Sequence, residues 1–110
     1  MKVVVAAIEP LQLHRARDAL AWVGVAGMTV TEVKGFGAEH TEIYRAAEYA
    51  VRFVSKVKVE VAVPAHLADK VVAAIQEAAG GGRSDDRAIY VMNFEQITRI
   101  RTGETDAAAL

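Results

Sequence analysis

Glycines and arginines that could hold a phosphate group cluster in one stretch, AGGGRSDDRA at residues 79–88. Glycine lets the main chain approach a ligand closely, and guanidinium groups bind phosphate oxygens well. Asp85 and Asp86 follow at once, and a carboxylate beside a polyphosphate adds like-charge repulsion. In a second interpretation, Asp86 caps an ordinary turn and pairs with Arg87. The stretch therefore predicts either a weakened phosphate cradle or a polar turn.

A second pair of basic residues, Arg99 and Arg101, flanks Ile100 near the end of the chain. In an extended segment these two side chains share a face and can converge on one polyphosphate. An isolated R-x-R pattern is otherwise typical of a solvated tail. The sequence therefore contains two candidate anion-binding elements.

Residues for covalent or metal chemistry are sparse. The chain has no cysteine, and His14, His40 and His66 are widely spaced, so thiolate metal sites and disulfides are excluded and no metal-ligand pattern is present. No serine pairs obviously with a base. We therefore expect a binding protein and not an enzyme.

The elements that must position these residues alternate between strands and helices. Hydrophobic periodicity and the stop signals Gly24 and Gly27 predict strands at 2–8, 28–36, 56–63 and 88–94, helices at 11–23 and 64–79, and a polar tail at 98–110. Val57, Val59, Val61 and Val63 alternate with polar or small residues, which indicates a strand with one face in a core. This βαββαβ order is typical of a ferredoxin-like α+β sandwich, with two helices on one face of an antiparallel sheet.

Composition limits the chain to one domain, residues 1–110, because 110 residues with 53% hydrophobic content bury a single core. A net charge of -1 argues against an electrostatic nucleic-acid binder. The apolar start of the chain is too short for a signal peptide, and no run approaches the roughly 20 apolar residues that span a bilayer. We therefore expect a cytoplasmic protein with no direct membrane insertion.

The segment joining the two halves, residues 37–53, is longer than a usual connection. It carries Tyr44 and Tyr49, and exposed aromatic residues are typical of contact surfaces. The two interpretations are an arm that contacts a partner and a loop that folds over its own sheet.

Four motifs occur in a fixed order along the chain: GMTVTEVKGFG at 27–37, HTEIYRAAEY at 40–49, KVKVEVAVP at 56–64 and RIRTGE at 99–104. Together they closely resemble the PII signal-transduction proteins, nearly end to end. The resemblance implies a homotrimer with a nucleotide site in each intersubunit cleft, where ATP and ADP compete and 2-oxoglutarate joins Mg-ATP. It also implies a T-loop at about 37–53, which docks on ammonium channels and nitrogen-assimilation enzymes, and a B-loop at about 80–88.

The RNA-recognition motif shares the βαββαβ order and begins its signature like KGFG at residues 34–37. The residues that follow, AEHT, lack the stacking aromatics of that signature, and only 6% of the chain is aromatic. RNA binding is therefore disfavoured.

The resemblance assigns nucleotide contacts in two groups. Adenine and ribose contacts fall on Thr29, Gly35, Phe36, Gly37, Glu60 and Ala62, and phosphate contacts fall on Gly82, Arg83, Arg87, Arg99 and Arg101. The B-loop departs from the family, since Asp85-Asp86-Arg87-Ala88 stands where the family has Gly-Asp-Gly-Lys. Arg83 and Arg87 compensate in part. We therefore expect ATP to bind more weakly than in the family, or in an altered mode.

A second departure lies at the base of the T-loop. The family has a glutamine there that helps hold magnesium, and this sequence has Glu39. A carboxylate can donate an oxygen to a metal, but its charge disfavours a neighbouring dicarboxylate. Gly37 and Lys56 still match 2-oxoglutarate contacts, so the sequence keeps part of that site. The change to Glu39 weakens the case for 2-oxoglutarate sensing by the family's mechanism.

Tyr49 matches the tyrosine that is uridylylated or adenylylated in many members, and an aromatic docking contact explains it equally well. The sequence favours a homotrimeric regulator of nitrogen metabolism that controls protein targets in response to adenine nucleotides. The alternatives are a trimer that senses another ligand, such as ADP, AMP, a different nucleotide or a small anion, and an interaction module without a ligand.

Overall fold

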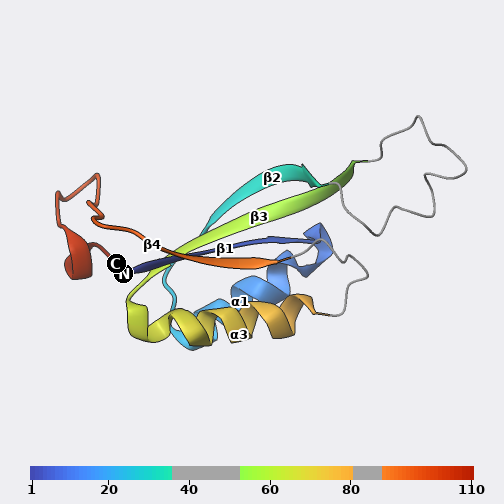
Figure 1. Cartoon of the computed structure of the whole chain (residues 1–110), viewed down its shortest axis with the longest axis horizontal. Coiled ribbons are helices and arrows are strands. Elements are labelled where there is room, and N and C mark those ends of the chain that lie inside the picture. The colour runs from blue at the N-terminus through green and yellow to red at the C-terminus, as the bar shows by residue number, and fades with distance from the viewer. Residues whose placement is uncertain (36–52, 81–87) are drawn as a thin grey trace, which may run out of the picture.

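A four-stranded antiparallel sheet with two helices on one face forms the framework of the chain (Figure 1). The computed structural model describes residues 1–35, 53–80 and 88–110. The strands are β1 (Lys2–Ile8), β2 (Thr29–Gly35), β3 (Val54–Val63) and β4 (Ile89–Asn93), and the helices are α1 (Leu13–Val23) and α3 (Ala68–Ala79). The strand order is β2-β3-β1-β4 with every neighbouring pair antiparallel. The predicted ferredoxin-like α+β fold is therefore confirmed.

The core lies between the sheet and the two helices. The alternation predicted for β3 is confirmed, because Val57, Val59, Val61 and Val63 are all buried. They pack in one cluster with residues of both helices, among them Leu20 of α1 and Ile75 of α3. Burial of this apolar surface is the main force that holds the helices on the sheet.

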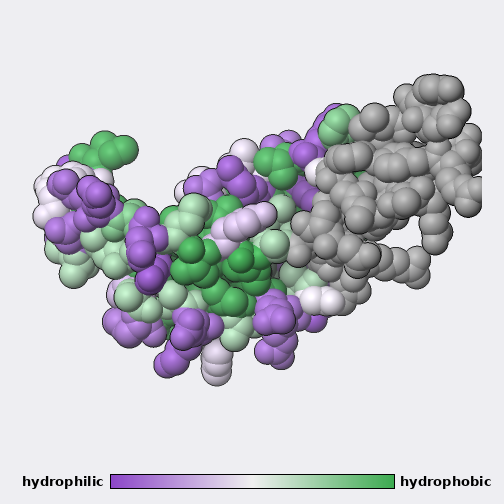
Figure 2. Space-filling model, viewed as in Figure 1, coloured by the Kyte–Doolittle hydropathy of each residue, from purple (hydrophilic) through white to green (hydrophobic). Residues whose placement is uncertain are grey.

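Among the residues that the structure describes, no helix covers the opposite face of the sheet. The register sets Val5 of β1 opposite both Glu60 of β3 and Tyr90 of β4, so these side chains share this face. Tyr90 is 61% exposed and Met92 is 49% exposed. Figure 2 shows hydrophobic residues gathered near β4 and α3. A sheet face with this much exposed apolar surface is suited to contact with another protein surface.

Both helices begin later than the periodicity predicts. A single 3-10 turn precedes each of them, at Pro10–Gln12 and Ala65–Leu67. The main-chain N–H of Gln12 donates to the Glu9 carbonyl at 2.9 Å, and that of Leu67 donates to the Pro64 carbonyl at 3.0 Å. Periodicity alone does not separate a 3-10 turn from the first turn of an α-helix.

Gly24 ends α1 in the left-handed region, with φ of 104°. The next residue, Val25, donates its N–H to the Leu20 carbonyl at 3.0 Å, which closes the helix. We expect Gly24→Ala to lower the free energy of unfolding by about 1 kcal/mol, because a Cβ is strained at this φ. Gly27→Ala is the matched control, since Gly27 has no positive φ and open space around it. Denaturant unfolding measures both, and equal losses would contradict this explanation.

The last segment of the chain, predicted as a polar tail at 98–110, is folded into turns. Arg99 donates its N–H to the Glu104 carbonyl and Gly103 donates to the Arg99 carbonyl, each at 2.8 Å. Gly103 has φ of 74°, which allows the reversal. A 3-10 turn follows at Asp106–Ala109, and Ala109 is buried. The chain therefore turns back on itself between Thr98 and Thr105, which pair in a bridge.

Candidate functional site

A cleft of about 530 Å³ lies between the loop after α1, the end of β3 and the C-terminal segment. Four residues with predicted nucleotide contacts line it: Thr29, Glu60, Ala62 and Arg99. Its remaining walls come from the loop that begins at Gly24, from Pro64 and Leu67, and from residues between 97 and 110. The fold thus brings together residues from the two ends of the range 24–110.

Strand pairing fixes the polar floor of this cleft. Thr29 begins β2 and lies directly opposite Glu60 on β3, so their side chains are neighbours on the face without helices. The Glu60 carboxylate lies 3.4 Å from the Lys58 ammonium, and both side chains remain partly exposed. A carboxylate and a hydroxyl beside the small Ala62 suit a flat, polar-edged ring such as adenine.

Contacts within the C-terminal segment orient Arg99 in the cleft. Its Nη2 donates to the Ala109 carbonyl at 3.0 Å, and its Nε lies 4.0 Å from Oε1 of Glu104. Thr102 donates its hydroxyl to the same carboxylate oxygen at 2.9 Å. The Arg99 side chain is still 47% exposed, and a guanidinium has five N–H donors. Arg99 therefore keeps donors that can bind an anion in the cleft.

Arg101 does not join Arg99 in the cleft. The expectation that both side chains share a face assumed an extended segment, and residues 100–102 instead form a turn. Arg101 is exposed and is not among the residues that line the cleft. The predicted convergence of the pair is therefore wrong for the single chain.

Gly35 lies at the far end of β2 from Thr29. It pairs with Val54, and the strand rises by six residue steps between the two ends, which corresponds to about 20 Å. Lys56 belongs to the same end, because it pairs with Val33. It is only 3% exposed. A hollow of about 430 Å³ adjoins this end of the strands, with Lys56 among its lining residues. The predicted site residues of one chain therefore form two separate groups.

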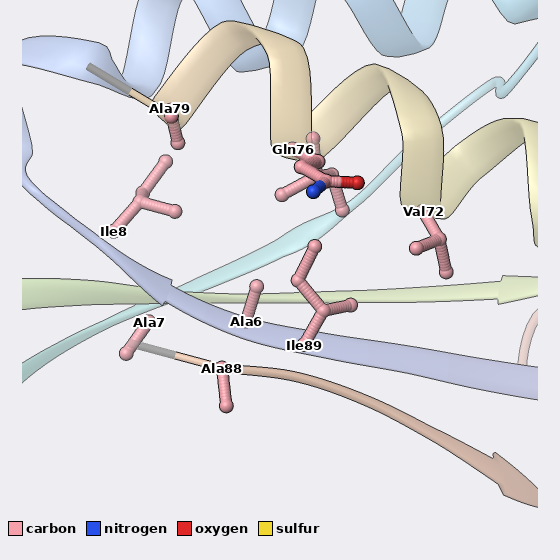
Figure 3. A pocket seen from close by; sticks show the side chains of 10 residues that line it. Ala6, Ala7, Ile8, Val72, Gln76, Ala79, Ala88 and Ile89 are labelled. Atoms are coloured by element: carbon pink, nitrogen blue, oxygen red, sulfur yellow. The ribbon is translucent and has the colours of Figure 1, made fainter. Parts of the chain in front are cut away.

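A third hollow is apolar. It measures about 360 Å³ and lies between α3, β1 and β4, with Ile8, Val72 and Ile89 among the residues that line it (Figure 3). Among the described residues that line this hollow, the polar side chain labelled in Figure 3 is Gln76. The described residues of this lining include no cation, so by themselves they do not suit a polyphosphate.

Seven predicted site residues lie outside the described ranges: Phe36, Gly37, Glu39, Tyr49, Gly82, Arg83 and Arg87. The T-loop and most of the B-loop lie there as well. Within residues 1–35, 53–80 and 88–110, no group of three His, Cys, Asp or Glu side chains could hold a metal ion. No helix in those ranges is long and apolar enough to cross a membrane.

The C-terminal wall of the cleft was not predicted from the sequence. Ile97, Ala107, Ala109 and Leu110 line it. The signal was present in the final AAAL, an apolar run that follows the polar TGETD. Small apolar residues at the end of a polar stretch are suited to packing against the body of the protein.

Comparisons with known proteins agree over the whole chain. A family model described as "Nitrogen regulatory protein P-II" matches residues 1–104. The chain is 50% identical to a nitrogen regulatory protein P-II of Rhizobium etli and 50% identical to nitrogen regulatory protein P-II 1 of Escherichia coli K12, with all of each chain covered. Nitrogen regulatory protein GlnK of Escherichia coli K12 is 46% identical over the same full length.

Proposed function

The chain belongs to the P-II family of nitrogen regulatory proteins, and from that premise we propose a regulator that controls protein targets in response to adenine nucleotides. The nucleotide binds where two copies of the chain meet. The protein acts in the cytoplasm as a homotrimer and transmits signals without catalysing a reaction. Its targets belong to nitrogen metabolism, as the family name indicates.

The observation that carries this proposal is the division of the predicted site. Thr29, Glu60 and Arg99 lie at one end of the β2–β3 pair, and Gly35 lies at the other, about 20 Å along the strand. One small nucleotide cannot contact both ends of one chain. A neighbouring copy that brings its Gly35 end to this cleft completes the set, which a cyclic oligomer does at every interface.

The exposed sheet face supports the same assembly. Tyr90 is 61% exposed and Met92 is 49% exposed on the face that carries Thr29 and Glu60. Burying such apolar side chains against a neighbour stabilises an oligomer. In the assembly that we propose, the cleft lies at the rim of this buried face, so oligomer formation and site formation are coupled.

In this cleft each side chain has a distinct role. Glu60 accepts hydrogen bonds from the base, Ala62 leaves room for the ring, and Arg99 donates to phosphate oxygens. ATP has one more phosphate group than ADP, and the additional negative charge distinguishes its bound state from that of ADP. Because β2 and β3 lead from the site to residues 37–53, a ligand that favours one loop shape changes the affinity for a target.

A second candidate is a sensor of ADP or AMP. In the part of the chain that the structure describes, Arg99 is the one arginine in the cleft, and the B-loop carries two aspartates. A nucleotide with fewer phosphate groups carries less negative charge and therefore suits such a site better. Binding of 2-oxoglutarate is a further proposal, which the buried Lys56 supports and Glu39 opposes.

Calorimetric titration with ATP, ADP and AMP, each with magnesium and with or without 2-oxoglutarate, tests this function. ATP binding that 2-oxoglutarate strengthens supports a nitrogen sensor of the family type. Tighter binding of ADP or AMP supports the second candidate. Absence of binding by all three nucleotides would contradict both and leave a ligand-independent interaction module.

A further inference from the structure

Glu104 contacts the arginine of the cleft but is not among the described residues that line the cleft. Its Oε1 lies 4.0 Å from Nε of Arg99, and about half of each side chain is exposed. An exposed ion pair of this kind contributes little to the stability of a fold. A carboxylate that contacts the phosphate-binding side chain from outside the cleft can instead affect the ligand through that side chain.

The turn that carries both residues lies in the C-terminal segment (red in Figure 1). Arg99 donates its main-chain N–H to the Glu104 carbonyl, and Gly103 donates to the Arg99 carbonyl, each at 2.8 Å. Thr98 and Thr105 pair in a bridge on either side. Because these contacts use main-chain atoms, a neutral side chain at position 104 should leave the turn folded.

Thr102 holds the carboxylate of Glu104 in place. Its hydroxyl donates to Oε1 at 2.9 Å, and its Oγ1 accepts the N–H of Glu104 at 3.3 Å. The oxygen that Thr102 holds is the one that lies 4.0 Å from Nε of Arg99. A glutamate side chain loses rotamer freedom when it is fixed, and this loss has already occurred before a ligand arrives. The carboxylate is therefore preorganised beside Arg99.

The guanidinium of Arg99 is held at two points. Its Nε faces Glu104, and one N–H of Nη2 donates to the Ala109 carbonyl at 3.0 Å. Of the five N–H donors of a guanidinium, those of Nη1 and the second N–H of Nη2 lie away from these two contacts. A planar group that is already oriented loses less freedom when it binds a phosphate.

We propose that Glu104 is a positioning residue for nucleotide binding, an inference that rests on the function proposed above. When Arg99 is present, the carboxylate orients the guanidinium toward the phosphates and raises their affinity. The half-exposed carboxylate is screened by water, so its repulsion of the phosphates is the smaller effect. Without Arg99, only the repulsion remains. The effect of Glu104 on ATP binding therefore changes sign with the residue at position 99.

A double-mutant cycle, measured by calorimetric titration with ATP, tests this change of sign. Glu104→Ala should weaken ATP binding by about three- to tenfold in the native background, a coupling of the size expected for groups in contact. In the Arg99→Ala background the same change should strengthen ATP binding by up to about twofold, because it removes a like charge. Weakening by the same factor in both backgrounds would overturn the proposal.

A conservative variant and a second ligand exclude a merely structural role. Glu104→Gln keeps an oxygen that can accept from Thr102 and from Nε, so it should retain native ATP affinity within about twofold. Adenosine has no phosphate, so Glu104→Ala should leave its affinity unchanged. Equal losses for ATP and adenosine would show damage to the cleft wall and would contradict the positioning role.

The matched control is Asp18→Ala, which removes a carboxylate from an exposed ion pair with Arg17 on α1. It changes the net charge as Glu104→Ala does and should leave ATP binding unchanged. If the native protein binds ATP and Glu104→Ala binds it equally well, this inference fails and the proposed function stands. If the native protein binds no nucleotide, both fail.

Discussion

Replacing Arg99 by alanine is expected to weaken ATP binding by about ten- to a hundredfold. A hydrogen bond to a charged group contributes about 1.5–3 kcal/mol, and each 1.4 kcal/mol changes an equilibrium constant tenfold. Among the described residues that line the cleft, Arg99 is the one arginine, and about half of its side chain is exposed. Calorimetric titration of the native protein and of Arg99→Ala measures the change directly.

Two variants separate phosphate binding from other effects of this substitution. Arg99→Lys keeps the charge and loses the fork of donors, so we expect an intermediate loss of affinity. Arg17→Ala removes an exposed arginine of α1 that pairs with Asp18, and it should leave ATP binding unchanged. Equal affinity of the native protein and a folded Arg99→Ala variant would show that the cleft does not hold the phosphates.

Restoring the family sequence in the B-loop should raise ATP affinity by about tenfold or more. The change combines Asp85→Gly, Arg87→Gly and Ala88→Lys. It removes a carboxylate, replaces the Arg87 guanidinium by an ammonium at position 88 and lets the main chain approach the phosphates. The prediction rests on the sequence, because residues 81–87 lie outside the described ranges. Titration with ATP and with AMP measures it, and ATP should gain far more than AMP.

A charge-matched control isolates the role of the loop. Asp18→Asn on α1 changes the net charge by +1, as the loop replacement does, and lies away from the cleft. We expect it to leave the affinity unchanged. If the restored loop binds ATP no more tightly than the native loop, then AGGGRSDDRA already holds phosphate as well as the family loop does, or takes no part in binding.

Local sequence signals were sufficient for the framework of the fold. The valines of β3 alternate with period two, and a strand with one buried face requires that pattern. Gly24 marks the end of the helix in the sequence, because glycine adopts the left-handed backbone conformation of a helix C-terminus with little strain. These features depend on nearby residues, so a single sequence records them.

Features that depend on distant contacts were not predictable in the same way. Arg99 was expected in an extended segment, and its conformation depends on the return of the chain from Gly103 to Ala109. The cleft depends on packing between the C-terminal residues and the loop after α1, which are about seventy or more residues apart in the sequence. The 3-10 turns before α1 and α3 were missed because their apolar spacing continues that of the helix.

The division of the site has a different cause. A motif match places Thr29 and Gly35 in one ligand site, and strand geometry separates them by about 20 Å in one chain. Neither periodicity nor spacing says whether two residues act in the same copy. The fold supplies that information, since it fixes the length of β2 between them.

Mixing two defective forms of the chain tests the shared cleft most directly. One form carries Arg99→Ala, and the other carries Gly35→Glu, which places a charged side chain at the opposite end of β2. Neither form alone should bind ATP well. In randomly mixed oligomers, about a quarter of the interfaces combine an intact Arg99 end with an intact Gly35 end. We predict that calorimetry of refolded or co-expressed mixtures recovers about that fraction of sites at native affinity. Mixtures that recover no sites, from folded oligomers of both forms, would contradict a nucleotide site shared between subunits.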